Sequence, residues 1–136
     1  MNTNDTDIKK ILTDYKQICV IGLSPDPTKP SHSVPMFMSS KGYEITGVYP
    51  GTSEIKGHKI YPNLADVPAD KRTFVNVFRR SEKIPEVVDE VLRLGGVKVL
   101  WLQLGISHPE AEKRAEAAGI KVVSNRCLLI EYRTLM

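Results

Sequence analysis

The 136-residue chain has little of several residue types, and each scarcity excludes a class of protein. Its only cysteines, Cys19 and Cys127, fit neither a Cys-x-x-Cys motif nor a zinc-type spacing, so a reducing cytoplasm suits them best. No apolar run approaches the roughly 18 residues of a membrane span. Residues 1–10 are polar and lack the apolar centre of a signal peptide. We therefore expect a cytoplasmic protein that is neither secreted nor inserted in a membrane.

Charge of one sign is also scarce, because 19 lysines and arginines stand against 16 acidic residues, a formal charge of +3. A dedicated nucleic-acid binder usually carries more positive charge, whereas a small anionic ligand is compatible with this balance. The three histidines are scattered, so we predict no metal site. We interpret His32 as an exposed residue of a first helical turn and His108 as part of a helix-capping turn. No Ser-His-Asp arrangement is evident, and we assign no catalytic residue.

What the chain does contain is an alternation of short β-branched runs with longer amphipathic stretches, which indicates an α/β fold. Its length suits one domain, residues 1–136. We predict a Rossmann-like three-layer αβα sandwich around a five-stranded, mainly parallel sheet. The five strands are expected at residues 18–21, 44–48, 73–77, 97–102 and 120–123, with a short irregular strand at 55–60. Helices are expected at 5–15, 34–41, 81–92 and 108–118, and a turn or short helix at 127–133. Ser81 is expected to cap the third of these helices, and Ser107 with Glu110 to form a capping box at the fourth.

Ligands of such sheets bind beyond the carboxyl ends of the strands, so the loops that follow the strands hold the candidate site. The loop from Gly22 to Ser31 leads into a helix whose free first-turn amides favour an anion such as phosphate. Gly22 permits close backbone approach, Ser24 and Ser31 offer hydroxyls, and Lys29 supplies a positive charge. The same residues are also compatible with a proline-stiffened surface turn, because the loop lacks both the dinucleotide fingerprint and the P-loop motif.

Two further loops adjoin it in the predicted sheet. The second strand ends in Tyr49-Pro50-Gly51, without the acid that usually holds an NAD ribose, so NAD is the minority interpretation. The third strand ends in Phe78-Arg79-Arg80, where the arginines can meet an anionic group or an adenine ring. A solvated arginine pair is the alternative. Cys127 lies at the same predicted edge, either as a small buried side chain or as a thiol facing a ligand thiol.

These motifs together resemble the stand-alone CoA-binding proteins, whose domain is similar to the N-terminal CoA-binding domain of the succinyl-CoA synthetase α-subunit. The resemblance runs from about Tyr15 to Arg133 and also includes Trp101-Leu102-Gln103-Leu104-Gly105 and Asn125-Arg126-Cys127. It implies a domain that holds coenzyme A by its adenosine 3′-phosphate and pyrophosphate. Carried over by position, the implied cofactor-binding residues are Gly22, Leu23, Ser24, Lys29, Ser31, Tyr49, Pro50, Gly51, Lys56, Phe78, Arg79 and Arg80.

The phosphorylated histidine of the synthetase lies in a second domain, so the resemblance favours a binding, carrier or regulatory module for CoA or an acyl-CoA over an enzyme. The first alternative is a small enzyme that uses CoA or NAD(P) through a spatially assembled site, with Cys127 as a candidate member. A second is an interaction module that has lost its ligand. We expect a small-molecule partner and neither nucleic acid nor membrane; a protein partner or a homo-oligomer is compatible with the sequence.

Overall fold

The computed structural model describes residues 4–136, and its helices and strands alternate as the sequence predicts. The α-helices are α1 (Asp5–Asp14), α2 (Pro30–Ser40), α3 (Ile84–Leu94), α4 (Pro109–Ala117) and α5 (Leu128–Leu135). The strands are β1 (Gln17–Ile21), β2 (Glu44–Val48), β3 (Glu54–Ile55), β4 (His58–Tyr61), β5 (Phe74–Val77), β6 (Val99–Leu102) and β7 (Lys121–Val123). Within the described residues, no helix is both long and apolar enough to cross a membrane.

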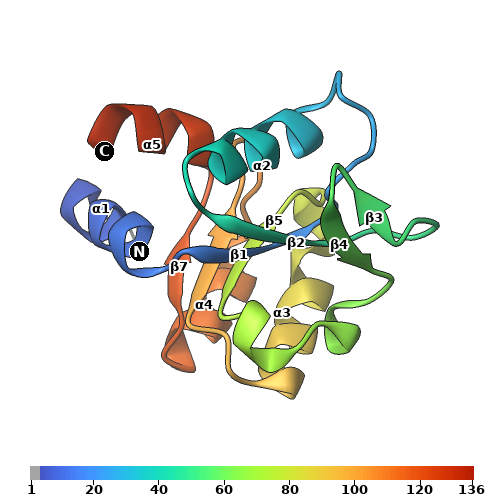
Figure 1. Cartoon of the computed structure of the whole chain (residues 1–136). Helices are drawn as coiled ribbons and strands as arrows, with labels where there is room; N and C mark the ends of the chain where they lie inside the picture. Colours follow the sequence, from blue (N-terminus) through green and yellow to red (C-terminus); the bar gives the residue numbers. More distant parts are fainter. Residues whose placement is uncertain (1–3) are drawn as a thin grey trace.

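The sheet is mostly parallel, which confirms the α/β Rossmann-like prediction, but it has seven strands in the order β3-β4-β2-β1-β5-β6-β7, so the five-strand prediction was wrong (Figure 1). The two additional strands, β3 and β4, form an antiparallel hairpin in which Ile55 pairs with His58. Lys56 and Gly57 join them, with φ angles of 52° and 84°. Two successive positive φ angles are typical of the tight turn that suits the twist of a two-residue hairpin. The first turn position is Lys56 rather than the asparagine, aspartate or glycine typical of this turn, so the sequence does not indicate the hairpin.

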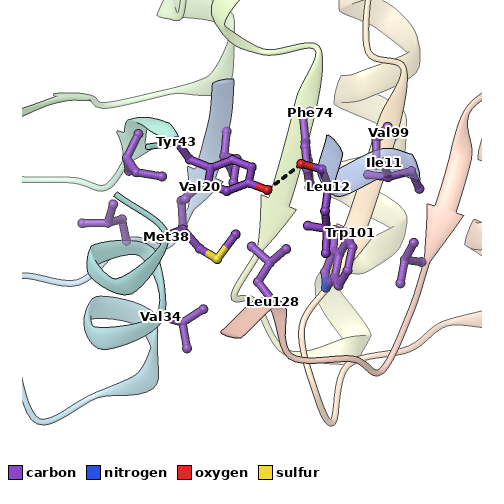
Figure 2. Packing of buried hydrophobic residues seen from close by; sticks show 14 of the residues in the cluster. Ile11, Leu12, Val20, Val34, Met38, Tyr43, Phe74, Val99, Trp101 and Leu128 are labelled. Carbon is purple, nitrogen blue, oxygen red and sulfur yellow. Dashed lines mark hydrogen bonds between the residues drawn. The ribbon is translucent and has the colours of Figure 1, made fainter. Parts of the chain in front are cut away.

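Helices cover both faces of the sheet, with α1, α2 and α5 on one side and α3 and α4 on the other (Figure 1). Alternation along the central strands divides their side chains between two cores: Ile18 and Val20 face the first group, whereas Cys19 and Ile21 face the second. Figure 2 shows the first core, where the Tyr43 hydroxyl donates to the carbonyl of Leu12. Burial of Tyr43 raises its pKa to about 12.

Three predicted helix starts differ from those observed, the first being that of α2, which begins at Pro30 rather than at residue 34. Ser81 does not cap α3: residues Ser81–Lys83 form a 3₁₀ turn, and the Ser81 hydroxyl accepts a hydrogen bond from the amide of Ser107 at 3.1 Å. In α4 the cap is His108, whose Nδ1 accepts from the amide of Ala111 at 3.2 Å. Its own amide donates to Glu112 at 2.8 Å. The reciprocal capping expected from Ser107 and Glu110 is therefore made instead by His108 with Glu112.

The chain reverses its winding between the two central strands. After β1 it crosses through α2 on one face of the sheet, and after β5 it crosses through α3 on the opposite face. The loops that leave these neighbouring strands thus separate above the carboxyl edge, which in open α/β sheets opens a crevice for ligands. This is the edge that the sequence identified as the candidate site.

Candidate functional site

Two adjoining hollows lie at the carboxyl edge of the sheet. The β1 hollow, of about 480 Å³, is lined by Gly22, Ser24, Tyr49 and Pro50 among others. The β6 hollow, of about 730 Å³, extends to Gln103, Leu104, Ile106 and Cys127. Both share the lining residues Lys29, Ser31, Phe78 and Arg79. The structure therefore brings together the loops after β1, β2, β5, β6 and β7 around one shared wall.

The loop after β1 is held by hydrogen bonds to the first turn of α2. The amide of Ser24 donates to the carbonyl of Ser31 at 3.1 Å, and Nδ1 of His32 donates to the carbonyl of Ser24 at 2.8 Å. Pro35, four residues after Ser31, has no N–H and cannot form the helical hydrogen bond to the Ser31 carbonyl, which therefore stays available to Ser24. His32 is only 5% exposed, which corrects our prediction of an exposed first-turn residue: its ring is buried because it supports the loop.

An Asx turn shapes the outer part of the same loop. Asp26 accepts hydrogen bonds from both the amide and the hydroxyl of Thr28, at 3.0 and 2.7 Å. These bonds, with smaller contributions from Lys29 and His32, lower the pKa of the Asp26 carboxyl. The Ser24 hydroxyl accepts from the amide of Asp26 at 3.0 Å and retains its own proton for donation into the hollow.

Gly22 is the point where the loops after β1 and β5 meet. Its φ is +91°, and a Cβ at this position would lie 2.6 Å from the carbonyl oxygen of Phe78. Any other residue would therefore be strained and would also collide with the neighbouring loop. Leu23, which follows, is fully buried and supports the loop from the core side.

The cationic side chains of the site differ in whether they already form an ion pair. Lys29 and Arg79 are exposed and form no ion pair with any described residue. Arg80 borders only the β6 hollow and forms a long ion pair with Glu82, at 3.7 Å. Since unpaired cations give up no internal partner when they bind an anion, Lys29 and Arg79 are the stronger candidates.

The remaining predicted residues divide into two groups. Tyr49 and Pro50 line the β1 hollow. Gly51 and Lys56 line neither hollow; both are exposed, and Lys56 is at the turn of the β3–β4 hairpin. A contact between either of these and a ligand stays a prediction.

Sequence reasoning missed the polar side chains beneath the β6 hollow. Asn76, fully buried in β5, donates to the carbonyl of Trp101 at 3.3 Å and to Oε1 of Gln103 at 3.4 Å. Oε1 of Gln103 also accepts from the amide of Leu128, the first residue of α5, at 3.4 Å. The signal was present, because Asn76 interrupts the apolar run Phe74-Val75-Asn76-Val77 and buried polar groups need partners.

Comparison with known proteins agrees with this geometry. A family model described as CoA binding domain matches residues 16–133. The chain belongs to this family. An uncharacterised Bacillus subtilis protein, YneT, is 37% identical over 133 residues, 96% of each chain. A Thermus thermophilus protein of solved structure is 35% identical, with a TM-score of 0.90 over 98% of this chain and all of that one.

A larger enzyme contains a related domain. The dinucleotide-forming acetyl-coenzyme A synthetase 1 of Candidatus Korarchaeum cryptofilum is 25% identical, with a TM-score of 0.70. The match covers 85% of this CoA-binding-family chain but only 27% of the synthetase chain. The resemblance found in the sequence, to CoA-binding proteins related to acyl-CoA synthetases, is therefore confirmed.

Proposed function

We propose that the chain binds coenzyme A at the two adjoining hollows and acts as a non-catalytic binding, carrier or regulatory module. One observation carries the proposal: Lys29 and Arg79, which belong to loops on opposite sides of the crevice, border the same two hollows and pair with no acidic side chain among residues 4–136. In a member of the CoA-binding domain family, this wall suits the phosphates of a nucleotide.

Different parts of this wall suit the different phosphate groups of CoA. In the first turn of α2, Pro30 has no N–H and the amides of His32 and Ser33 donate to the Lys29 carbonyl. The Ser31 amide and the ammonium of Lys29 therefore favour the pyrophosphate on one side of the crevice. The guanidinium of Arg79 offers paired N–H donors for a second phosphate, such as the 3′-phosphate, on the other. Phe78 and Tyr49 provide aromatic surface beside these groups. The second strand ends in Tyr49-Pro50-Gly51 and provides no acid for the ribose hydroxyls of NAD, which favours CoA.

Titration calorimetry with CoA, dephospho-CoA and NAD tests the proposal. We expect CoA to bind, dephospho-CoA to bind more weakly because it lacks one phosphate, and NAD to bind weakest. Lys29→Ala should weaken CoA binding by about 1–3 kcal/mol through loss of a charge-assisted contact. Lys121→Ala is the matched control, because it removes an exposed lysine from the amino end of β7, at the opposite edge of the sheet.

Two results would count against it. Absence of any heat or thermal shift with CoA at millimolar concentration would refute CoA binding. Turnover of an acyl-CoA by the purified chain would show that the module is an enzyme and would refute the non-catalytic part.

A further inference from the structure

The β6 hollow contains features that phosphate binding does not explain. It is larger than the β1 hollow and extends away from the shared cationic wall toward Leu104, Ile106 and Cys127. If the nucleotide phosphates of CoA occupy the shared wall, as the proposed function requires, the rest of the ligand needs a second surface. That remainder is a chain with two amides and a terminal thiol.

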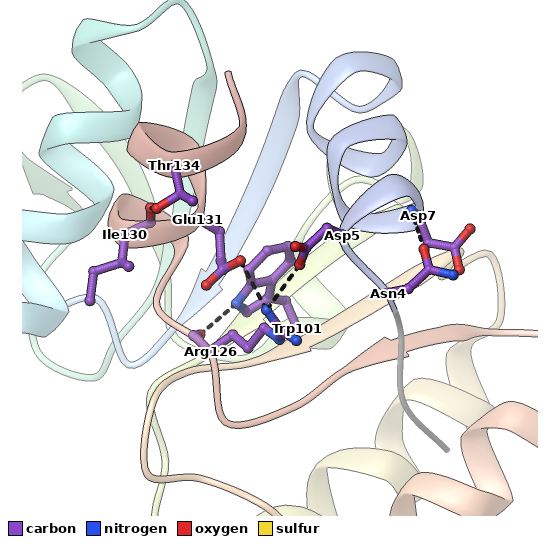
Figure 3. A network of polar contacts seen from close by, with 8 residues as sticks. All are labelled: Asn4, Asp5, Asp7, Trp101, Arg126, Ile130, Glu131 and Thr134. Atoms are coloured by element: carbon purple, nitrogen blue, oxygen red, sulfur yellow. Dashed lines mark hydrogen bonds and ion pairs between the residues drawn. The ribbon is translucent and has the colours of Figure 1, made fainter.

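Cys127 has a fixed position on the wall of this hollow. The amide of Gly105 donates to Oδ1 of Asn125 at 2.7 Å, and the indole of Trp101 donates to the carbonyl of Arg126 at 2.8 Å. Arg126 also forms ion pairs with Glu131 at 3.1 Å and Asp5 at 3.6 Å, which tie the segment to α5 and α1 (Figure 3). Cys127 follows directly as the N-cap of α5, is partly exposed, and makes no side-chain capping bond.

A second side chain in the same wall also has an unused polar group. Gln103 is 4% exposed and lines the β6 hollow. Its Oε1 is occupied by Asn76 and by the amide of Leu128, whereas its Nε2 has no partner among the described residues. This nitrogen is not fully enclosed, and because Gln103 lines the hollow, its N–H groups can donate to a ligand carbonyl there. An amide-bearing chain that ends in sulfur meets both requirements of this wall.

We propose that Cys127 captures the thiol end of CoA as a reversible mixed disulfide, with Gln103 as a positioning residue that donates to an amide carbonyl of the ligand. The co-reactant is the disulfide form of the ligand. The Cys127 thiol loses its proton to water, and its sulfur attacks one sulfur of that disulfide. The Sγ–S bond forms as the ligand S–S bond breaks, and the second half leaves as a thiolate that takes up a proton. Cys127 is oxidised to the disulfide level and half of the ligand is reduced to thiol.

Intact mass measurement of the full chain after incubation with CoA disulfide tests this step. We expect one CoA moiety to be added and to be removed by dithiothreitol. Cys127→Ser should abolish the adduct. Cys19→Ala should retain it, because Cys19 is fully enclosed in the core and burial raises the pKa of its thiol to about 12.

Cystamine, a small disulfide without a nucleotide, separates guided capture from simple exposure of a thiol. CoA disulfide should react faster on the order of a hundredfold, because binding raises the local concentration of its sulfur. Gln103→Met removes the N–H donors without adding a charge beside the thiol, and should slow the CoA disulfide reaction more than the cystamine reaction.

The outcomes separate this inference from the proposed function. Equal rates for the two disulfides, or an adduct that persists in Cys127→Ser, would overturn the capture. If calorimetry shows CoA binding but the wild-type chain forms no adduct, the capture fails and CoA binding stands. If the wild-type chain binds no CoA at all, the proposed function fails and the capture fails with it.

Discussion

The two loops that enclose the crevice are built in different ways. In the loop after β1, residues 22–29, the side chains of Ser24 and Asp26 accept hydrogen bonds from backbone amides. The buried ring of His32 donates to the Ser24 carbonyl. The loop after β5 presents exposed guanidinium groups, and the ion pair between Arg80 and Glu82 is long and solvated. One side of the site is thus rigid before any ligand arrives, while the other keeps flexible side chains. This difference predicts that substitutions of Gly22 and of the supporting His32 affect stability first, whereas substitutions of the arginines after β5 affect affinity.

The largest effect on stability is expected at Gly22, where the two loops touch. Gly22→Ala should lower the free energy of unfolding by about 2–4 kcal/mol, because the positive φ strains alanine and its Cβ would press on the Phe78 carbonyl. Gly51→Ala is the matched control, since its φ is +89° but nothing lies within 4 Å of the added Cβ. It should cost about 1 kcal/mol. Equal losses in chemical denaturation would show that the Phe78 loop yields without penalty.

His32 tests the rigidity of the first loop. His32→Ala leaves the Ser24 carbonyl without its side-chain donor, which should destabilise the protein by about 1–3 kcal/mol. Hydrogen exchange at the amides of Asp26, Thr28 and Lys29 should accelerate as the loop loosens. His32→Asn supplies an amide nitrogen near the place of Nδ1 and should recover part of both effects. Unchanged exchange in His32→Ala would mean that the loop holds its shape without the imidazole.

A comparison within the second loop sharpens the roles of its arginines. Arg79→Ala should weaken CoA binding by about 1–3 kcal/mol, because Arg79 borders both hollows and forms no ion pair within the described part of the chain. Arg80→Ala should cost less than about 1 kcal/mol, because Arg80 is exposed and already paired with Glu82. Calorimetry measures both, and thermal unfolding should show neither variant destabilised. A larger effect at Arg80 would reverse the assignment.

The sequence predicted those features that depend on local pattern. Helix α3 was expected because its aliphatic residues Val87, Val88 and Val91 recur at helical spacing, and all three are buried. The cationic wall was expected because parallel strands end at one edge of the sheet. The burial of His32 was not, since it depends on a hydrogen bond to Ser24, eight residues earlier, that only the folded loop creates.

Long-range partners explain the other errors. Serine is a common helix cap, but the Ser81 hydroxyl accepts a hydrogen bond from the amide of Ser107 instead. Only the packing of the loops after β5 and β6 brings these two residues together. Likewise Gln103 looked like one polar residue of a loop motif until the fold placed it beside Asn76 and the start of α5. A single sequence therefore does not show whether a polar side chain bonds to a local partner or to one that the fold brings near.

The smallest expected effect is a pH dependence confined to the first loop. The hydrogen bonds from Thr28 lower the pKa of Asp26, so the folded loop favours the carboxylate. This contribution is present above the ordinary carboxyl pKa and disappears as pH falls through the lowered value. Thr28→Val removes the hydroxyl donor but keeps the backbone donor, and should raise the pKa of Asp26 part of the way toward its ordinary value. An NMR titration of the Asp26 carboxyl measures this shift. Thr13→Val is the control, because the Thr13 hydroxyl donates to the Lys9 carbonyl within α1. An unchanged Asp26 titration in Thr28→Val would mean that the backbone bond alone shapes the turn, and that the rigidity of this loop rests on His32.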